Sequence, residues 1–310
     1  MSESPAADPL AHRTIPLYQT QGRLYEHKTN FISMQPLSSL PEETRALFKP
    51  ASPASQGKDG EATEQEEGKG APEPHVLTVS ETIFHAQGGG QPSDTGIMTT
   101  PTPAAVPEND SEPNNATVFT VHQVRTLPTG AILHMGVFPS PTSTFAPSTQ
   151  LHQAINIPLR ILHSRLHTAG HVIGLAVNML IQRGDLPDTI KDSKASHYPS
   201  AAYVTFTGSI PSSLVPTIQT TIDGMVAQDL AVSIAFWNEE RARRECFGVE
   251  DGTGLKGDDM GVRVVEMGGR GSYPCGGTHV ESLGQLGRVV VKGVKRGKGV
   301  SRISYDVADK

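Results

Sequence analysis

The chain has 310 residues, of which 36% are hydrophobic, so it is long enough for two domains and a sizeable core. It contains no apolar run of membrane-spanning length, and its first residues are polar and acidic, so we expect no membrane partner, secretory signal or transit peptide. Its two cysteines, Cys246 and Cys275, provide no disulfide framework and indicate a reducing compartment, for which we expect the cytoplasm.

The formal net charge of −6 argues against a nucleic-acid partner until it is divided along the chain. Residues 1–150 hold eight Lys or Arg against sixteen Asp or Glu, whereas residues 151–310 hold eighteen against sixteen. The stretch from Arg288 to Arg302 carries six basic residues and no acidic one. Such a strip can contact phosphates although the whole chain is acidic, and a solvated surface strip is the alternative.

The N-terminal half is predicted to be a small β-barrel over residues 14–150, after a disordered tail at 1–13. Strands are predicted from residue 18 to residue 33 and, by their alternating apolar residues, at 75–84, 116–124 and 131–138. Short strands separated by turn signals are typical of such a barrel. Three stretches of low complexity cannot bury much apolar surface and indicate insertions, at 50–74, 100–115 and 139–149.

A glycine-rich segment from Gln87 to Gly96 follows the strand predicted at 75–84. Its three consecutive glycines, Gly88, Gly89 and Gly90, permit positive φ and the close approach of another molecule or element. No Gly-Lys-Ser/Thr follows, so a phosphate-binding P-loop is excluded and no nucleotide cofactor is implied. A tight β-turn within the barrel is the alternative to a binding loop.

The pattern changes after residue 150, and residues 151–310 are predicted to form a domain of helices and sheet. Apolar residues recur at helical intervals over 160–182 and 211–230, and a short charged helix is predicted over 238–246. Strands are predicted at 203–206, 232–237, 262–267, 289–294 and 302–307. The fold class is therefore α+β, with a small N-terminal β-barrel before a second, α+β domain.

Two pairs of metal-binding residue types lie far apart in this second domain. His167 and His171 are four apart in a predicted helix, so they share one face and can hold one metal ion. Cys275 and His279 are also four apart, but two glycines between them predict a tight turn. Three imidazoles and one thiolate are a zinc ligand set, and separate hydrogen-bonded histidines are the alternative. Eight residues of helix rise about 12 Å, so His163 and His171 cannot both ligate the ion held by His167.

In the order and spacing of these motifs, the chain resembles the free-standing, AlaX-type alanyl-tRNA editing proteins, relatives of the editing domain of alanyl-tRNA synthetase. The matching stretches are Phe84–Gly96, Arg165–Val172 and Val262–Ile303, the last of which contains P-C-G-G-T-H-V and a basic end. The similarity is to the two-domain, medium-length members, which place a β-barrel before the zinc-binding editing domain.

The resemblance implies a zinc-dependent hydrolase that removes wrongly attached serine, with glycine as a second candidate, from tRNA(Ala). Metal-activated water would attack the aminoacyl ester, and mischarged tRNA would be the partner. The residues that correspond to the family's zinc ligands are His167, His171, Cys275 and His279. Gly88–Gly90 and Gln91 correspond to its Gly-rich loop near the editing pocket.

Individual roles follow from that correspondence. Cys275 and His279 are assigned to catalysis as zinc ligands. Because four protein ligands normally close a zinc site, either the ion becomes five-coordinate or one ligand yields to water, and His279 is the ligand expected to yield. Gln91 is expected to orient water or substrate, and no general base is assigned. Ser196, with Ser193 as the other candidate, is expected to contact the substrate serine. Contacts with tRNA are expected from Lys292, Lys295, Arg296, Lys298 and Arg302.

Two alternatives remain beside this interpretation. Related zinc editing domains serve threonine, so the substrate could be a different mischarged tRNA such as Ser-tRNA(Thr). A non-catalytic, zinc-stabilised tRNA-binding module would retain the same fold and ligands.

Overall fold

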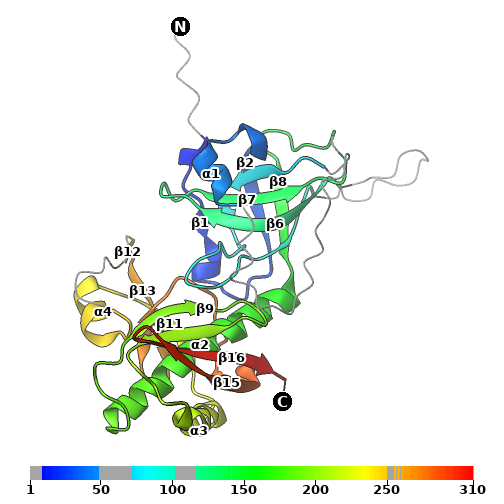
Figure 1. The fold of residues 1–310 in the computed structure, drawn as a ribbon. Helices are drawn as coiled ribbons and strands as arrows, with labels where there is room; N and C mark the ends of the chain where they lie inside the picture. Colours follow the sequence, from blue (N-terminus) through cyan, green and yellow to red (C-terminus); the bar gives the residue numbers. More distant parts are fainter. Residues whose placement is uncertain are drawn as a thin grey trace. The chain divides into compact units, whose positions relative to one another are not determined.

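The computed structural model describes residues 9–48, 72–101, 116–140, 142–249, 255, 257–258 and 260–309. Most of the expected tail and most of the expected insertions at 50–74 and 100–115 lie outside the described residues. The chain divides into two compact units, residues 1–87 with 93–160 and residues 88–92 with 161–310 (Figure 1). The glycine-rich residues 88–92 therefore group with the second unit, whereas the sequence pattern assigned them to the barrel.

The first unit is built on a closed barrel of antiparallel strands. Its strands, in spatial order, are β2 (Glu26–Pro36), β3 (His75–Val79), β7 (Ile132–Val137), β6 (Val118–Thr126), β5 (Gly96–Thr99) and β8 (Gln150–Ile155). Alternate residues fill the interior, as Phe119 and Val121 of β6 do with no exposed surface. The predicted α+β class with an N-terminal small β-barrel is confirmed.

Short elements complete the first unit. Strand β1 (Ile15–Pro16) pairs in parallel with β4 (Glu81–Thr82), and α1 covers Glu42–Ala46. Three 3-10 helices lie at Pro9–Ala11, Leu17–Gln19 and Leu37–Ser39. The strand predicted from residue 18 is therefore wrong at its beginning, because the chain first turns through a 3-10 helix.

The segment 139–149, which was expected to be an insertion, contributes to the barrel core where it is described. Phe145 is buried, and its ring meets those of Phe31 and Phe138 edge-on at centroid distances of 5.9 and 5.3 Å. An aromatic side chain carries enough apolar surface to anchor a segment that is otherwise rich in Pro, Ser and Thr.

The described residues of the second unit form two sheets and contribute to three α-helices. One sheet has the order β15 (Arg288–Gly297), β16 (Val300–Ala308), β10 (Tyr203–Thr207) and β9 (Asp192–Ser196). In the other, β13 (Gly261–Met267) pairs with β11 (Val232–Trp237), β12 (Gly257–Asp258) and β14 (Ser272–Pro274). The helices are α2 (Ile157–Gln182), α3 (Val215–Ala227) and α4 (Glu239–Glu245), with 3-10 turns at Ser212–Leu214 and Leu283–Leu286.

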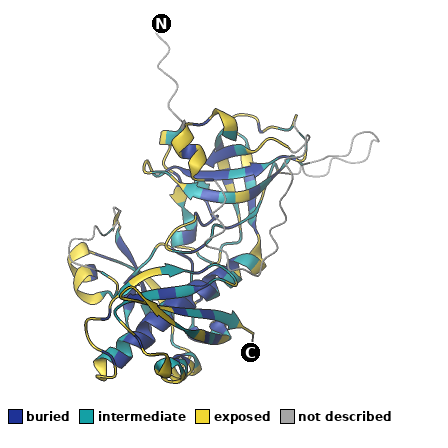
Figure 2. Cartoon of the chain, viewed as in Figure 1, coloured by how far each residue is buried: buried dark blue, intermediate teal, exposed yellow. Residues whose placement is uncertain are grey.

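Helix α2 positions the site, and its sequence explains its limits. The Asn156 side chain accepts the backbone N–H of Leu159 at 3.1 Å, which caps the first turn. Gly184, at φ +82°, follows the last turn and supplies the left-handed conformation that ends many helices. The apolar stripe of α2 packs into the core of the second unit, and Figure 2 shows buried residues along the helix. None of the described helices combines the length and apolar character that a membrane crossing needs.

A buried ion pair between Arg160 and Asp94, both in the first unit, holds the first turn of α2. Arg160 and Asp94 have 1% and 2% of their side-chain surface exposed, and Arg160 Nε lies 3.0 Å from both carboxylate oxygens. Arg160 also donates to the carbonyls of Gly22 and Ile83, and Asp94 accepts the backbone N–H of His85. Both charges are therefore paired and hydrogen-bonded, which is the condition under which buried ions are tolerated.

We predict that Arg160→Ala lowers the free energy of unfolding by about 3–5 kcal/mol, because it leaves the Asp94 carboxylate buried without its cation. Urea denaturation of both proteins measures the difference. Arg244→Ala is the matched control, since Arg244 forms exposed ion pairs with Glu240 and Glu245, and it should change stability by less than about 1 kcal/mol. Equal losses for the two variants would contradict the prediction.

Candidate metal centre

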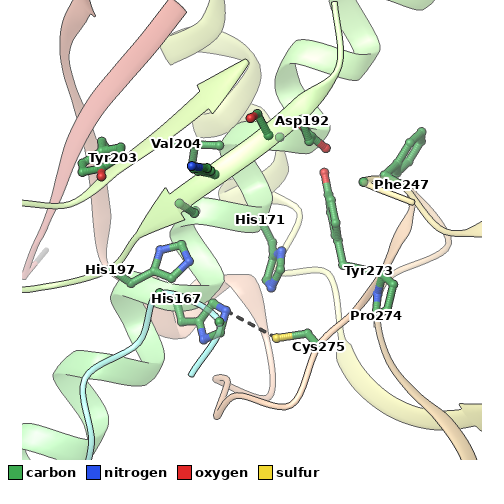
Figure 3. A pocket seen from close by; sticks show the side chains of 18 of the residues that line it. His167, His171, Asp192, His197, Tyr203, Val204, Phe247, Tyr273, Pro274 and Cys275 are labelled. Carbon is green, nitrogen blue, oxygen red and sulfur yellow. Dashed lines mark hydrogen bonds between the residues drawn. The ribbon is translucent and has the colours of Figure 1, made fainter. Parts of the chain in front are cut away.

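Four side chains from two separate elements meet in the second unit. Helix α2 supplies His167 and His171, and the turn after β14 supplies Cys275 and His279. Their ligand atoms all lie within 4.8 Å of one another. Cys275 Sγ is 3.4 Å from His167 Nε2 and 3.3 Å from His279 Nε2 (Figure 3). This group could hold a metal ion.

The ring of His167 is held by the loop that contains the glycines. Gln91 Oε1 accepts the backbone N–H of Thr278 at 3.0 Å, which identifies it as the amide oxygen, and it lies 2.7 Å from His167 Nδ1. His167 therefore carries its proton on Nδ1 and presents the lone pair of Nε2. The Gln91 NH2 group donates to Thr278 Oγ1 at 2.8 Å. Both polar atoms of Gln91 contact protein groups, which favours a positioning role over the orientation of water or substrate.

The ring of His279 is fixed in the same sense by Thr168. The hydroxyl of Thr168 donates to the carbonyl of Ser164 at 2.8 Å and lies 3.1 Å from His279 Nδ1. A hydroxyl has one proton, so Thr168 Oγ1 must accept from His279 Nδ1–H. His279 thus also presents its Nε2 lone pair. Hydrogen bonds that orient ligating imidazoles in this way are usual in metal sites.

His171 and Cys275 supply the other half of the test for a metal. His171 Nε2 is buried and has no hydrogen-bond partner among the described residues, which is costly unless another group binds this nitrogen. Burial, with a smaller effect from Arg263, lowers the pKa of His171 to about 3, so the imidazole is neutral. Burial raises the pKa of the Cys275 thiol, against the opposing effects of the Gly277 N–H and Arg263, and a bound cation favours its thiolate. The residues present therefore fit a divalent metal ion.

Two glycines allow the close approach on which this group depends. A Cβ on Gly90, whose φ is +80°, would lie 2.5 Å from the carbonyl oxygen of Ala195. A Cβ on Gly277 would lie 2.8 Å from Gln91 Oε1 and closer still to the His167 ring. Neither position has room for a side chain.

A cavity of about 530 Å³ opens beside the metal-binding group. His167, His171 and Cys275 line it, whereas His279 is not among its lining residues (Figure 3). This arrangement does not favour His279 as the ligand that yields to water. The cavity wall is completed by Gly89 and Gly90, by the glycines of α2, by His197, and by residues of β9, β10 and β14, including Asp192, Ser193, Tyr203 and Tyr273.

His197 is a cavity residue that the sequence did not point to. Tyr305 donates its hydroxyl proton to the carbonyl of Leu166 at 2.9 Å, so it accepts from His197 Nδ1 at 2.6 Å. The ring of His197 stacks on that of His167 at a centroid distance of 4.3 Å. Burial, with a smaller effect from His171, lowers its pKa to about 3. No metal-ligand spacing surrounds residue 197, so nothing in the sequence alone distinguishes it.

The other predicted residues lie in different surroundings. Ser196 is on β9 but is not among the residues that line the cavity, whereas Ser193 is. Gly88 forms the narrow turn to Gln91 through a pair of backbone hydrogen bonds. His163 is buried, as expected of a histidine outside the ligand set. The five basic residues proposed for tRNA contact are exposed and lie on β15, β16 or the turn between them: Lys292, Lys295, Arg296, Lys298 and Arg302.

Comparison with known proteins supplies an independent finding. Residues 262–304 match the family described as the threonyl and alanyl tRNA synthetase second additional domain. The chain is 28% identical over 233 residues to an alanine–tRNA ligase of Nocardioides sp., and 27% identical over 237 residues to that of Methanococcus vannielii. These matches cover 73% and 74% of this chain but only 23% of each relative, so the chain spans about a quarter of their length. Together they confirm the resemblance to AlaX-type proteins and fit a relative of the alanyl-tRNA synthetase editing region.

Proposed function

We propose that the protein is a zinc-dependent hydrolase that deacylates mischarged Ser-tRNA(Ala), with Gly-tRNA(Ala) as a further substrate. The observation that carries the proposal is a group of three imidazoles and one thiol, three of whose members face a cavity. The likeness to alanine–tRNA ligases supports tRNA(Ala) as the nucleic acid.

Zinc is the metal that this donor set favours, because mixed nitrogen and sulfur ligands suit a borderline-soft cation. His167 and His279 would bind zinc through Nε2, because their Nδ1 atoms donate to Gln91 and Thr168. When bound, zinc acts as a Lewis acid that polarises a carbonyl or lowers the pKa of water toward about 7.

The chain's own residues have a limited task in this reaction, because an ester between an amino acid and a ribose hydroxyl is intrinsically labile. Gln91 and Thr168 hold two ligand rings in one orientation. Burial lowers the pKa of His171 to about 3, so this imidazole is neutral and able to donate its lone pair. The cavity provides a place for the aminoacyl group beside the metal-binding side chains.

We expect purified, zinc-loaded protein to hydrolyse Ser-tRNA(Ala) and to leave Ala-tRNA(Ala) intact. A filter assay with radiolabelled aminoacyl-tRNA measures the rate with and without a chelator, and with zinc restored. Chelation should abolish deacylation, and added zinc should restore it, because the ester would lose its Lewis acid.

Two controls separate the alternatives to this prediction. Cys275→Ala should abolish deacylation while tRNA affinity is retained, whereas Cys246→Ala removes the chain's other thiol and should leave the rate unchanged. If Ser-tRNA(Thr) were hydrolysed faster than Ser-tRNA(Ala), the substrate would be Ser-tRNA(Thr). Absence of hydrolysis with retained tRNA binding would indicate the non-catalytic, zinc-stabilised module.

We predict that Gln91→Ala weakens zinc binding by about 10–100-fold, because the Nδ1 proton of His167 loses its acceptor and the ring loses its fixed orientation. Competition with a fluorescent chelator measures the dissociation constant. Gln87→Ala changes an exposed glutamine of the same loop and should have no effect. Unchanged zinc affinity in the Gln91 variant would contradict the positioning role.

The exposed basic residues of the β15–β16 hairpin are proposed to contact tRNA phosphates. Lys295, Arg296 and Lys298 form no ion pair with the described residues, whereas Lys292 pairs with Asp306 at 2.8 Å. Replacing these three by Gln should weaken tRNA binding and reduce the salt dependence, by about 0.7–0.9 in the logarithmic slope for each lost phosphate contact. Binding measured from low to moderate salt tests this. Changing Arg243 and Arg244 of α4 to Gln is the control, and equal effects in both variants would exclude the hairpin.

A further inference from the structure

Two polar groups of the cavity wall are left without partners, and neither is needed to hold the metal. Asp192 lies on β9, and Tyr273 lies on β14 (Figure 3). Asp192 Oδ1 and Tyr273 Oη are both buried, and neither has a hydrogen-bond partner within the part of the chain that the structure describes. The figure shows the hydroxyl end of Tyr273 pointing toward Asp192.

Both atoms lie next to Gly174 of α2, which has no side chain. A Cβ on Gly174 would lie 3.5 Å from Asp192 Oδ1 and closer still to Tyr273 Oη. The Tyr273 ring also packs against His171, with centroids 4.5 Å apart. The two polar groups therefore lie on the same wall of the cavity as the metal-binding side chains.

Among the described residues, no cation pairs with the carboxyl of Asp192. Burial raises its pKa to about 6, against the weaker hydrogen-bonding effects of Tyr273 and Asn178, which lower it and come from neutral side chains. Although Tyr273 approaches the carboxyl, no described donor reaches hydrogen-bond geometry at Oδ1. A buried polar atom without a partner costs about 1–3 kcal/mol, and a ligand that supplies the partner recovers that cost.

We propose that Asp192 and Tyr273 form a subsite for the α-ammonium group of the aminoacyl ester. The inference rests on the proposed function, and it adds the part of the substrate that the chain recognises. An ammonium has a positive charge and three donors, so it can satisfy the Asp192 carboxylate and the Tyr273 oxygen together. A serine side-chain hydroxyl could donate to one of these acceptors, but it would leave the carboxylate without a positive counter-charge.

The consequence is a class of substrate. Esters with a free α-ammonium group would bind, whereas esters of α-hydroxy acids of the same size would bind poorly, because they leave a buried carboxylate unpaired. Asp192 would be a specificity-determining residue, and the metal-binding side chains would be the same for both classes.

The test uses stable 3′-amide analogues of aminoacyl-adenosine and the full, zinc-loaded chain. One probe carries L-serine and the other carries L-glyceric acid, in which a hydroxyl replaces the α-ammonium group. Calorimetry should give an affinity at least tenfold higher for the seryl probe in the wild-type protein. Asp192→Asn should reduce this preference below threefold, and Tyr273→Phe should reduce it in the same direction. Asp188→Asn, which changes an exposed carboxylate just before β9, should retain it.

Equal affinity for the two probes in the wild-type protein, or a preference that persists in Asp192→Asn, would overturn the subsite. A glycyl probe that binds as weakly as the glyceryl probe would also overturn it, since recognition would then depend on the serine hydroxyl. These measurements need no hydrolysis. A protein that shows the preference but does not deacylate Ser-tRNA(Ala) would refute the proposed function alone, and deacylation without the preference would refute the subsite alone.

Discussion

Everything in the second unit depends on a requirement of imidazole chemistry: a ring that binds a metal through Nε2 must give its Nδ1 proton to a fixed acceptor. The chain meets this requirement twice by different means. Gln91 accepts from His167, and Thr168 accepts from His279. Each acceptor is itself held by another hydrogen bond, to Thr278 or to Ser164, so neither can turn away easily.

Close packing against α2 explains two of its glycines. His167 and His171 occupy one face of the helix, and Gly170 and Gly174 interrupt that face. A side chain at Gly170 would collide with His197 and Tyr305, and a side chain at Gly174 would collide with Tyr273. A glycine within a helix costs about 1 kcal/mol relative to alanine, so α2 forgoes helical stability where neighbouring rings must approach its backbone.

The sequence was sufficient where the chemistry is local. The i, i+4 spacing of two histidines and the C-G-G-T-H turn each define a geometry within five residues. The predicted strands at 75–84, 116–124 and 131–138 are present in the barrel, whereas β5 and β8 were not predicted. The acceptors could not be predicted in the same way, because Gln91 meets Thr278 across 187 residues and no periodicity encodes that contact. Ser196 illustrates a finer limit. No strand was predicted at β9, and Ser196 is the one residue of that strand that does not line the cavity, whereas Ser193 does.

The five residues from Gly88 to Pro92 have a consequence for modularity. They stand in the sequence between parts of the barrel unit, but they group with the metal-binding unit, where Gln91 contacts His167. If the chain were cut after Arg160, the four candidate ligands would stay together on the C-terminal fragment. Gln91, whose side-chain amide orients His167, would be on the other fragment. Moving the complete candidate metal centre to another protein would therefore require two segments of the chain, residues 88–92 and the part after Arg160.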